Sequence, residues 1–185
     1  MSFDYNYDES FQDNSAIFMN QNHQNHQGHQ KTNFDKVIDF CKCAGQPVYT
    51  EHQLNIFEEH PERVDLRLKL IQEEVKELEQ AIQERNFTEV IDALSDILYV
   101  TYGAAGTFGI SIDETFNLVH ESNMTKFCKT EEEAQETVEW YKLNEKRYKE
   151  PSYRKSEDSD HWIVFNAENG KILKNINYKP VMFNV

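Results

Sequence analysis

The sequence predicts an all-α protein, a bundle of four to five helices with a small C-terminal β-hairpin. Residues 61–85 and 88–108 repeat apolar side chains at intervals of three and four, which is the spacing of one helix face. Residues 161–174 contain two short apolar runs around Asn169-Gly170, a dipeptide typical of tight hairpin turns. We divide the chain into a disordered leader rich in Asn, Gln and His (1–31), a helical domain (32–150) and an extension with the hairpin (151–185).

Local signals place the ends of the helices. The first helix is expected to start after Asn33 and to end near Gly45, and Pro61 suits the first turn of the second helix. A Ser or Thr followed three residues later by Glu forms a capping box, in which each side chain binds a free backbone N–H group. Such boxes are expected to open the fourth and fifth helices: Ser111 with Glu114, and Thr130 with Glu133.

The charge of the chain limits its partners. The formal net charge is −14 and the sequence pI is about 4.9, which argues against binding to nucleic-acid polymers, because that contact needs Lys and Arg against phosphates. The N-terminus has no apolar signal sequence, and no apolar run is long enough for a membrane span. Three cysteines at irregular spacing, Cys41, Cys43 and Cys128, favour reduced thiols, and we expect a cytoplasmic protein.

Two neighbouring helices carry paired carboxylates. A second apolar row of the helix over 61–85 begins with leucines and changes into acidic residues, and Glu73 lies on its edge. On the next helix Asp92 and Asp96 are one turn apart and share a face. An ordinary solvated face would not begin with two leucines, although most other acidic residues are expected to be solvated. That row comprises Leu66, Leu70, Glu74, Glu77 and Ala81.

These carboxylates point to a divalent cation. A short link makes the two helices antiparallel neighbours, so that the acidic pairs face each other. Carboxylates that close cannot all stay ionised unless protons or cations compensate them. Mg²⁺, with Mn²⁺ as a possible substitute, fits such oxygen ligands, whereas di-iron chemistry does not, because no Glu lies three residues before a histidine. The expected metal ligands are Glu74, Glu77, Asp92 and Asp96.

Other polar residues suggest phosphoryl chemistry around that metal. Glu73 and Glu74 are the candidate catalytic residues, with Glu73 as the base that deprotonates the attacking water. His120, Asn123 and Lys126 fall on one side of the fourth helix, and Tyr99 belongs to the polar row of the third. We expect these four to bind substrate. His120 is equally well explained as a hydrogen-bonded helix side chain, and a tyrosine in the position of Tyr99 is more often a core or rim residue.

The acidic segments resemble a known superfamily. The runs EEVKEL (73–78), EVIDALSDILYVTYGAAGTFGI (89–110) and HESNMTKF (120–127) are similar to those of the all-α nucleoside triphosphate pyrophosphohydrolases. Within that superfamily the likeness is greatest to MazG-like proteins called phosphoribosyl-ATP pyrophosphohydrolase-like. VIDFCKCAGQPV (37–48) and GKILKNINYKPV (170–181) are also similar to segments of those proteins, so the resemblance spans about residues 33–185.

The resemblance implies a reaction and a site. The reaction is a Mg²⁺-dependent hydrolysis between the α and β phosphates of a nucleotide, which yields a monophosphate and pyrophosphate. The EExxE pattern of the family falls on Glu73, Glu74 and Glu77, and its phosphate-contacting positions on Asn123 and Lys126. The family's ExxD pattern departs here, because Ala93 stands where Glu is usual. Either Asp92 substitutes and pairs with Asp96, which we favour, or Glu89 pairs with Asp92.

The resemblance also implies a homodimer or a dimer of dimers, and it leaves three functions open. The first is hydrolysis of a nucleoside or deoxynucleoside triphosphate for nucleotide-pool sanitation. The second is hydrolysis of phosphoribosyl-ATP in histidine biosynthesis. The third is a catalytically silent helical dimer that binds a nucleotide or a partner, an alternative that the altered ExxD pattern leaves open.

Overall fold

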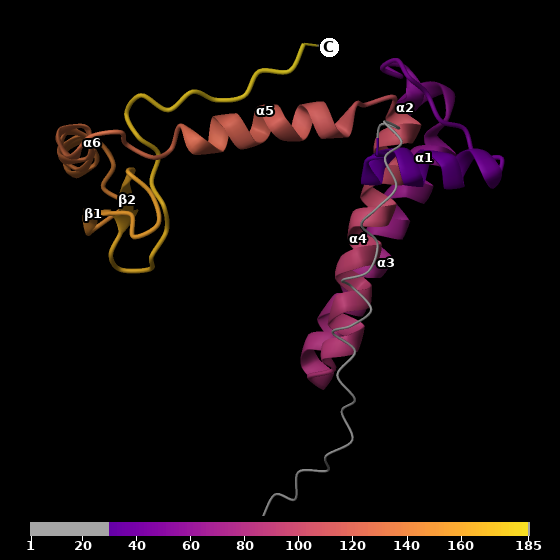
Figure 1. Ribbon diagram of the computed structural model, residues 1–185, viewed down its shortest axis with the longest axis horizontal. Helices are drawn as coiled ribbons and strands as arrows, with labels where there is room; N and C mark the ends of the chain where they lie inside the picture. Colours follow the sequence, from indigo (N-terminus) through magenta and orange to yellow (C-terminus); the bar gives the residue numbers. More distant parts are fainter. Residues whose placement is uncertain (1–29, 185) are drawn as a thin grey trace, which may run out of the picture. The chain divides into compact units, whose positions relative to one another are not determined.

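The computed structural model describes residues 30–184, which confirm the predicted all-α class with a small C-terminal sheet (Figure 1). Most of the predicted leader, 1–31, lies outside the described residues, and the boundary at 150/151 stays a prediction. None of the described helices is both long and apolar enough to cross a membrane. The described elements are α1 (Asn33–Cys43), α2 (Ile56–Glu59), α3 (Pro61–Glu84), α4 (Phe87–Phe108), α5 (Ile112–Met124), α6 (Glu131–Asn144), β1 (Pro151–Lys155) and β2 (Trp162–Asn166).

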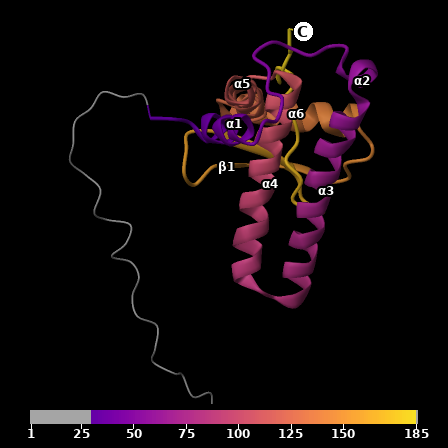
Figure 2. The same ribbon diagram turned by 90° about the vertical axis from the view of Figure 1, so that its right-hand side faces the viewer.

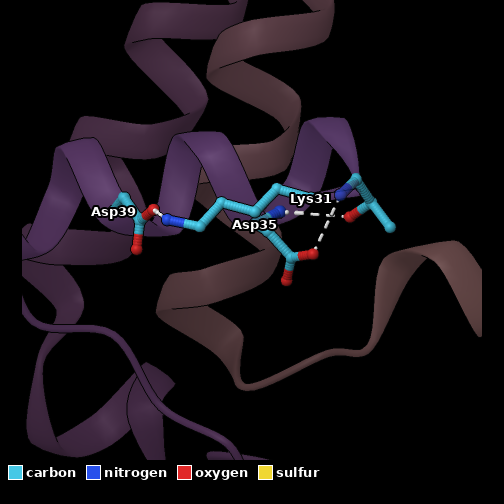
Figure 3. Close-up of polar contacts among 4 residues, drawn as sticks. Lys31, Asp35 and Asp39 are labelled. Carbon is cyan, nitrogen blue, oxygen red and sulfur yellow. Dashed lines mark hydrogen bonds and ion pairs between the residues drawn. The ribbon is translucent and has the colours of Figure 1, made fainter. Parts of the chain in front are cut away.

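Helix α1 begins with a complete capping box. The side chain of Thr32 accepts a hydrogen bond from the backbone N–H of Asp35, and the Asp35 carboxylate accepts one from the backbone N–H of Thr32 (Figure 3). Lys31 pairs with Asp39 along the exposed side of the same helix. Val37 and Cys41, one turn apart, are buried, and α1 packs on α4 through this side.

Helices α3 and α4 form an antiparallel hairpin, and both were predicted to within one residue at each end (Figure 2). The link is tight because Arg85 adopts a left-handed conformation (φ 55°) and the Asn86 side chain caps α4 by accepting from the backbone N–H of Glu89. Ala81 and Ala93 are both about 3 % exposed, and such small side chains let two helix backbones approach closely. The hairpin therefore sets which residues of α3 face α4.

The loop before α3 crosses the C-terminal end of α4 at very short range. Backbone N–H groups of Tyr49 and Gln53 donate to the carbonyl oxygens of Gly106 and Phe108. Gly109 ends α4 with φ 70°, and a Cβ atom there would lie 1.8 Å from the carbonyl oxygen of Glu51. Only glycine fits this crossing. Helix α2, in the same connection, was not predicted, because four residues are too few to show a helical period.

The two predicted capping boxes differ in outcome. Ser111 is the N-cap of α5 but makes no side-chain hydrogen bond, so that prediction is wrong in its mechanism. The backbone carbonyl of Ser111 instead accepts from Thr115 N–H as the first bond of the helix. Thr130 does cap α6 by accepting from the backbone N–H of Glu133. Glu133 reaches back to the backbone N–H of Lys129, at 2.7 Å, one residue earlier than the motif predicts.

The C-terminal sheet contains the predicted pairing over a short stretch and a longer pairing that was not predicted. Strand β2 was expected to pair with residues 171–175, and the N–H groups of Asn166 and Leu173 do bond the carbonyls of Lys171 and Val164 at 2.9 Å. The full strand partner of β2 is β1, in antiparallel register, with Tyr153 opposite Val164. Gly170 does make the predicted turn, with its N–H donating to the carbonyl of Asn166, and the returning chain then forms one isolated bridge to β2. Tyr153 and Trp162, diagonal across the two strands, pack their rings 5.8 Å apart, a contact that favours β1 as the partner.

Helix α6 packs on both strands around one apolar cluster. Because α6 and the strands share this cluster, we call residues 126–184 the C-terminal module. The cluster consists of Cys128, Ala134, Val138, Tyr141, Val164 and Leu173.

Glu133 joins three separate parts of this module. Besides Lys129 N–H, its carboxylate accepts hydrogen bonds of 2.8 Å from the side-chain amides of Asn175 and Asn177. Burial raises the pKa of Glu133, but the hydrogen bonds from Asn177, Asn175 and Lys129 outweigh it, so the pKa lies below the ordinary value of 4.5. The ionised carboxylate therefore holds the C-terminal segment against the start of α6.

We predict that Glu133→Gln lowers the free energy of unfolding by about 1 kcal/mol at pH 7, because charge-assisted hydrogen bonds are lost. A depressed pKa contributes stability above pH 4.5 that is lost as the pH falls through the folded-state pKa. The wild type should therefore lose stability below about pH 4.5 more steeply than the variant. Urea unfolding between pH 3 and 7 measures this, with Glu136→Gln, an exposed change one turn along, as control. Equal pH profiles would contradict the role of Glu133.

Candidate functional site

The five predicted carboxylates of α3 and α4 gather around Glu74. This residue lies half-buried at the middle of α3, on the side that faces α4. Burial raises the pKa of Glu74 above 4.5, and four negative charges raise it further: Glu77, Asp96, Glu73 and Asp92, in that order. Two of these charges come from α4, so the antiparallel hairpin places Asp92 and Asp96 within electrostatic range of Glu74. The metal site predicted from these residues stays a prediction.

The members of this acidic cluster differ in exposure. Glu74 and Asp96 are half-buried, whereas Glu73, Glu77 and Asp92 are exposed. Ala93, at the position where the family carries Glu, is buried at 3 % exposure against the hairpin. Asp92 and Asp96 lie on either side of it, one on the solvent side and one inside. The cluster therefore has an inner pair of carboxylates and an outer set open to water.

The donor set suits a hard divalent cation, since every member is a carboxylate, and four like charges add to burial in raising the pKa of Glu74. Within residues 30–184, however, no three Asp, Glu, His or Cys side chains are close enough to hold one metal ion together. The cluster thus has ligands of the right chemical type, but they are too far apart to hold one metal ion. Binding of a cation would move the exposed carboxylates closer to the half-buried ones. A cation between them would remove the like-charge repulsion on Glu74.

Arg67 was not singled out from the sequence, and it is buried at 8 % exposure on the same face of α3, seven residues before Glu74. Its guanidinium donates to Thr107 Oγ1 at 2.8 Å and to Gln46 Oε1 at 3.0 Å. Both acceptors are neutral. A Cβ atom on Gly103 would lie 3.0 Å from Arg67 Nη1, so the glycine makes room for a side chain rather than for a backbone. The two-turn spacing from Glu74 was the available signal for this residue.

Arg67 fixes the geometry next to the acidic cluster. It ties α3 to α4 through Thr107 and to the loop after α1 through Gln46. A buried guanidinium is costly unless its N–H groups are bonded, so these contacts hold its position firmly. The spacing of α3 and α4 is therefore set two turns from Glu74 by a polar bond as well as by small side chains.

Two of the four predicted substrate-binding residues are joined to each other. Lys126 Nζ donates to Asn123 Oδ1 at 2.7 Å, where α5 ends. His120 is exposed on α5. Tyr99 lies against α1, its ring edge-on to Phe40 at 5.6 Å. Among the described residues no hydrogen bond or ion pair links these four to the acidic cluster, so the single chain does not bring the two groups together.

The α3–α4 hairpin also exposes a large apolar surface, which we call the hairpin face. These side chains are 40 % exposed or more, although several belong to the apolar stripes predicted for a core. Exposed large apolar side chains in such number on one hairpin are typical of an interaction surface. The hairpin face comprises Leu68, Val75, Ile82, Phe87, Ile91, Leu94 and Leu98.

The α3–α4 hairpin lies within a match to a known family. The family model described as phosphoribosyl-ATP pyrophosphohydrolase matches residues 43–123, which include α3, α4 and all five clustered carboxylates. An uncharacterized protein of Acanthamoeba polyphaga mimivirus is 30 % identical, with 80 % of this chain and 92 % of that protein aligned. The chain therefore belongs to the phosphoribosyl-ATP pyrophosphohydrolase family, within the MazG-like all-α NTP pyrophosphatase superfamily, and is a pyrophosphohydrolase that acts on phosphoric anhydride bonds.

Proposed function

We propose that the protein is a Mg²⁺-dependent nucleoside triphosphate pyrophosphohydrolase that cleaves between the α and β phosphates. The observation that carries this proposal is the presence of four other carboxylates around half-buried Glu74, which has a raised pKa. Family membership supports the bond class. The free thiols of Cys41, Cys43 and Cys128 suit the reducing cytoplasm, where such an enzyme would remove unwanted nucleotides from the pool.

The residues divide into three roles. Glu74, Glu77, Asp92 and Asp96 would hold Mg²⁺, with Mn²⁺ as a substitute. When bound, the metal supplies positive charge that neutralises the phosphate oxygens. Asn123 and Lys126 would bind phosphate, with His120 and Tyr99 at the edges of the substrate. Lys126 suits this role because it carries the positive charge next to the Asn123 amide, a donor for phosphate oxygens.

Glu73 would orient and deprotonate the attacking water. It is exposed at the edge of the cluster, so water reaches it without any rearrangement of the helices. The water oxygen forms a bond to the α-phosphorus as the bond to the bridging oxygen breaks, and pyrophosphate leaves with that electron pair. The proton of the water passes to the Glu73 carboxylate and then to solvent. The products are a nucleoside monophosphate and pyrophosphate.

We further propose that the enzyme works as a homodimer or a dimer of dimers, with the hairpin face covered by a second copy. Three features support a second copy as the occupant. The hairpin face is apolar on both helices, its side chains continue the stripes predicted for a core, and the residues of α5 do not reach the acidic cluster of their own chain. A second copy can supply both the missing cover and a second α5.

A second candidate function is hydrolysis of phosphoribosyl-ATP. The family model that matches the chain carries this activity in its description, and the same acidic cluster would serve the same bond cleavage. The two functions differ only in the group attached to the phosphates, so one substrate panel separates them.

We predict that the purified protein with Mg²⁺ releases pyrophosphate from at least one member of a panel of ribo- and deoxynucleoside triphosphates and phosphoribosyl-ATP. Glu74→Gln and Asp96→Asn should each lower kcat/KM about a hundredfold or more, because an inner carboxylate is lost. Glu79→Gln, an exposed change on the same helix, should retain activity. Release of orthophosphate, or full activity in Glu74→Gln, would contradict the proposal. Binding without turnover would favour the silent dimer.

We predict that the wild type sediments as a dimer or tetramer at about 10 µM and that Leu94→Glu is monomeric. A charge placed in a buried apolar interface is costly unless it is paired. Leu143→Glu is the matched control, since Leu143 is 78 % exposed but lies on α6, outside the hairpin face. Analytical ultracentrifugation measures all three proteins. A monomeric wild type would show that the hairpin face is not covered by a second copy.

A further inference from the structure

The segment 174–179, which we call the tail segment, is hydrogen-bonded to the end of α5 where Asn123 and Lys126 lie. Ser122 Oγ donates to the carbonyl oxygen of Lys179 at 2.8 Å, and Lys179 N–H donates to Thr125 Oγ1 at 3.0 Å. The N–H of Asn175 donates to the carbonyl oxygen of Lys126 at 3.2 Å. The expected phosphate-binding residues and the tail segment therefore form one unit, although about fifty residues separate them in the sequence.

Helix α6 also binds the backbone of the tail segment. The N–H of Lys174 donates to the hydroxyl of Tyr141 at 3.1 Å, and the N–H of Ile176 donates to Thr137 Oγ1 at 3.4 Å. Tyr141 and Thr137 are both buried, so these bonds fix the backbone of the tail segment. The C-terminal chain passes beside α6 and the end of α5 (Figure 1). The backbone of the tail segment is therefore held in place by hydrogen bonds to α6.

A pocket of about 290 Å³ lies between the tail segment and α6. That volume is at the lower end of the range for small-molecule sites, so it suits a single ring system with a small substituent. It is too small for a folded partner. The lining residues are Trp140, Tyr141, Lys174, Asn175, Ile176 and Tyr178.

The lining is aromatic, and most of it is not needed for the core. Trp140 is 46 % exposed and Ile176 is 41 % exposed, and neither belongs to the apolar cluster of the C-terminal module. Lys174 Nζ stands 4.4 Å from the centre of the Tyr178 ring. The pocket therefore offers flat apolar surfaces together with one ammonium donor. Such surroundings suit a planar heterocycle that stacks on aromatic rings and accepts a hydrogen bond.

We propose that this pocket binds the nucleobase of the nucleotide, which rests on the proposed function for the phosphates. Trp140 and Tyr178 provide the aromatic walls, and the Lys174 ammonium donates to a ring nitrogen or carbonyl of the base. Tyr178 also connects the pocket to the phosphate side, because its hydroxyl lies 3.1 Å from Ser122 Oγ, next to Asn123. The C-terminal module is then a specificity element of the enzyme, outside the acidic cluster.

The test combines kinetics with direct binding on the full-length protein. Trp140→Ala should raise KM for the best nucleotide substrate about tenfold or more, with kcat changed less than about twofold, because stacking is lost and the phosphate contacts remain. Lys174→Met, which keeps the backbone bond to Tyr141, should raise KM and change the order of preference among bases. Leu143→Ala on the same helix as Trp140 and Lys171→Met, three residues before Lys174, are the controls, and neither residue lines the pocket.

Binding is measured through tryptophan fluorescence, without Mg²⁺ and without phosphate. Adenosine, guanosine, cytidine and uridine are titrated separately, and at least one should quench emission with saturation in the wild type and in Leu143→Ala, but not in Trp140→Ala. Trp162, the other tryptophan, lies in the sheet and is the internal reference. Circular dichroism melting of each variant identifies any loss of folding, and Lys174→Met keeps the test decisive if Trp140→Ala unfolds.

The outcomes separate this inference from the proposed function. If nucleotides are hydrolysed but KM is unchanged in Trp140→Ala and Lys174→Met, and no nucleoside quenches with saturation, the base lies elsewhere and this inference is wrong. Saturable quenching without hydrolysis of any nucleotide would uphold the pocket and remove the proposed activity. Quenching that rises linearly and equally in all variants is collisional and would also overturn the pocket.

Discussion

Like-charge repulsion around Glu74 is the constraint on which the candidate site depends, and the antiparallel pairing of α3 and α4 maintains it. Burial raises the pKa of Glu74, and four other carboxylates, two of them from the opposite helix, raise it further. A folded chain tolerates such repulsion only where other contacts hold the helices together. Here those contacts are the buried alanines of the hairpin and the bonds from Arg67 to Thr107 and Gln46.

The C-terminal module is stabilised by contacts other than those of the hairpin. Its own apolar cluster makes it stable, and the Glu133 carboxylate fastens the tail segment to α6. The tail segment in turn binds the end of α5 through the hydroxyl groups of Ser122 and Thr125 and the carbonyl oxygen of Lys126. In this account the hairpin supplies the charge for the reaction, and the module orders the residues that would recognise the substrate. The two tasks are therefore assigned to different parts of the chain.

Sequence reasoning predicted the long elements and missed what depends on tertiary contacts. The apolar side chains of α3 and α4 recur clearly at intervals of three and four, because one face of each helix is apolar. The same helical spacing identified the five carboxylates as candidates for one site. The pairing of β1 with β2 was missed, since it depends on the contact between Tyr153 and Trp162 rather than on a local turn. The burial of Arg67 was missed because arginine is ordinarily a surface residue, and only Gly103 and Thr107 make its position possible.

The central claim is that the acidic cluster exists to bind a divalent cation. The most direct test is the melting temperature of the wild type, Glu74→Gln and Glu79→Gln, each with and without Mg²⁺. A raised carboxylate pKa means that ionised Glu74 costs stability at neutral pH, so without metal Glu74→Gln should melt higher than the wild type. Mg²⁺ should raise the melting temperature of the wild type and of Glu79→Gln, but not of Glu74→Gln. An equal response to Mg²⁺ in all three proteins would contradict the claim.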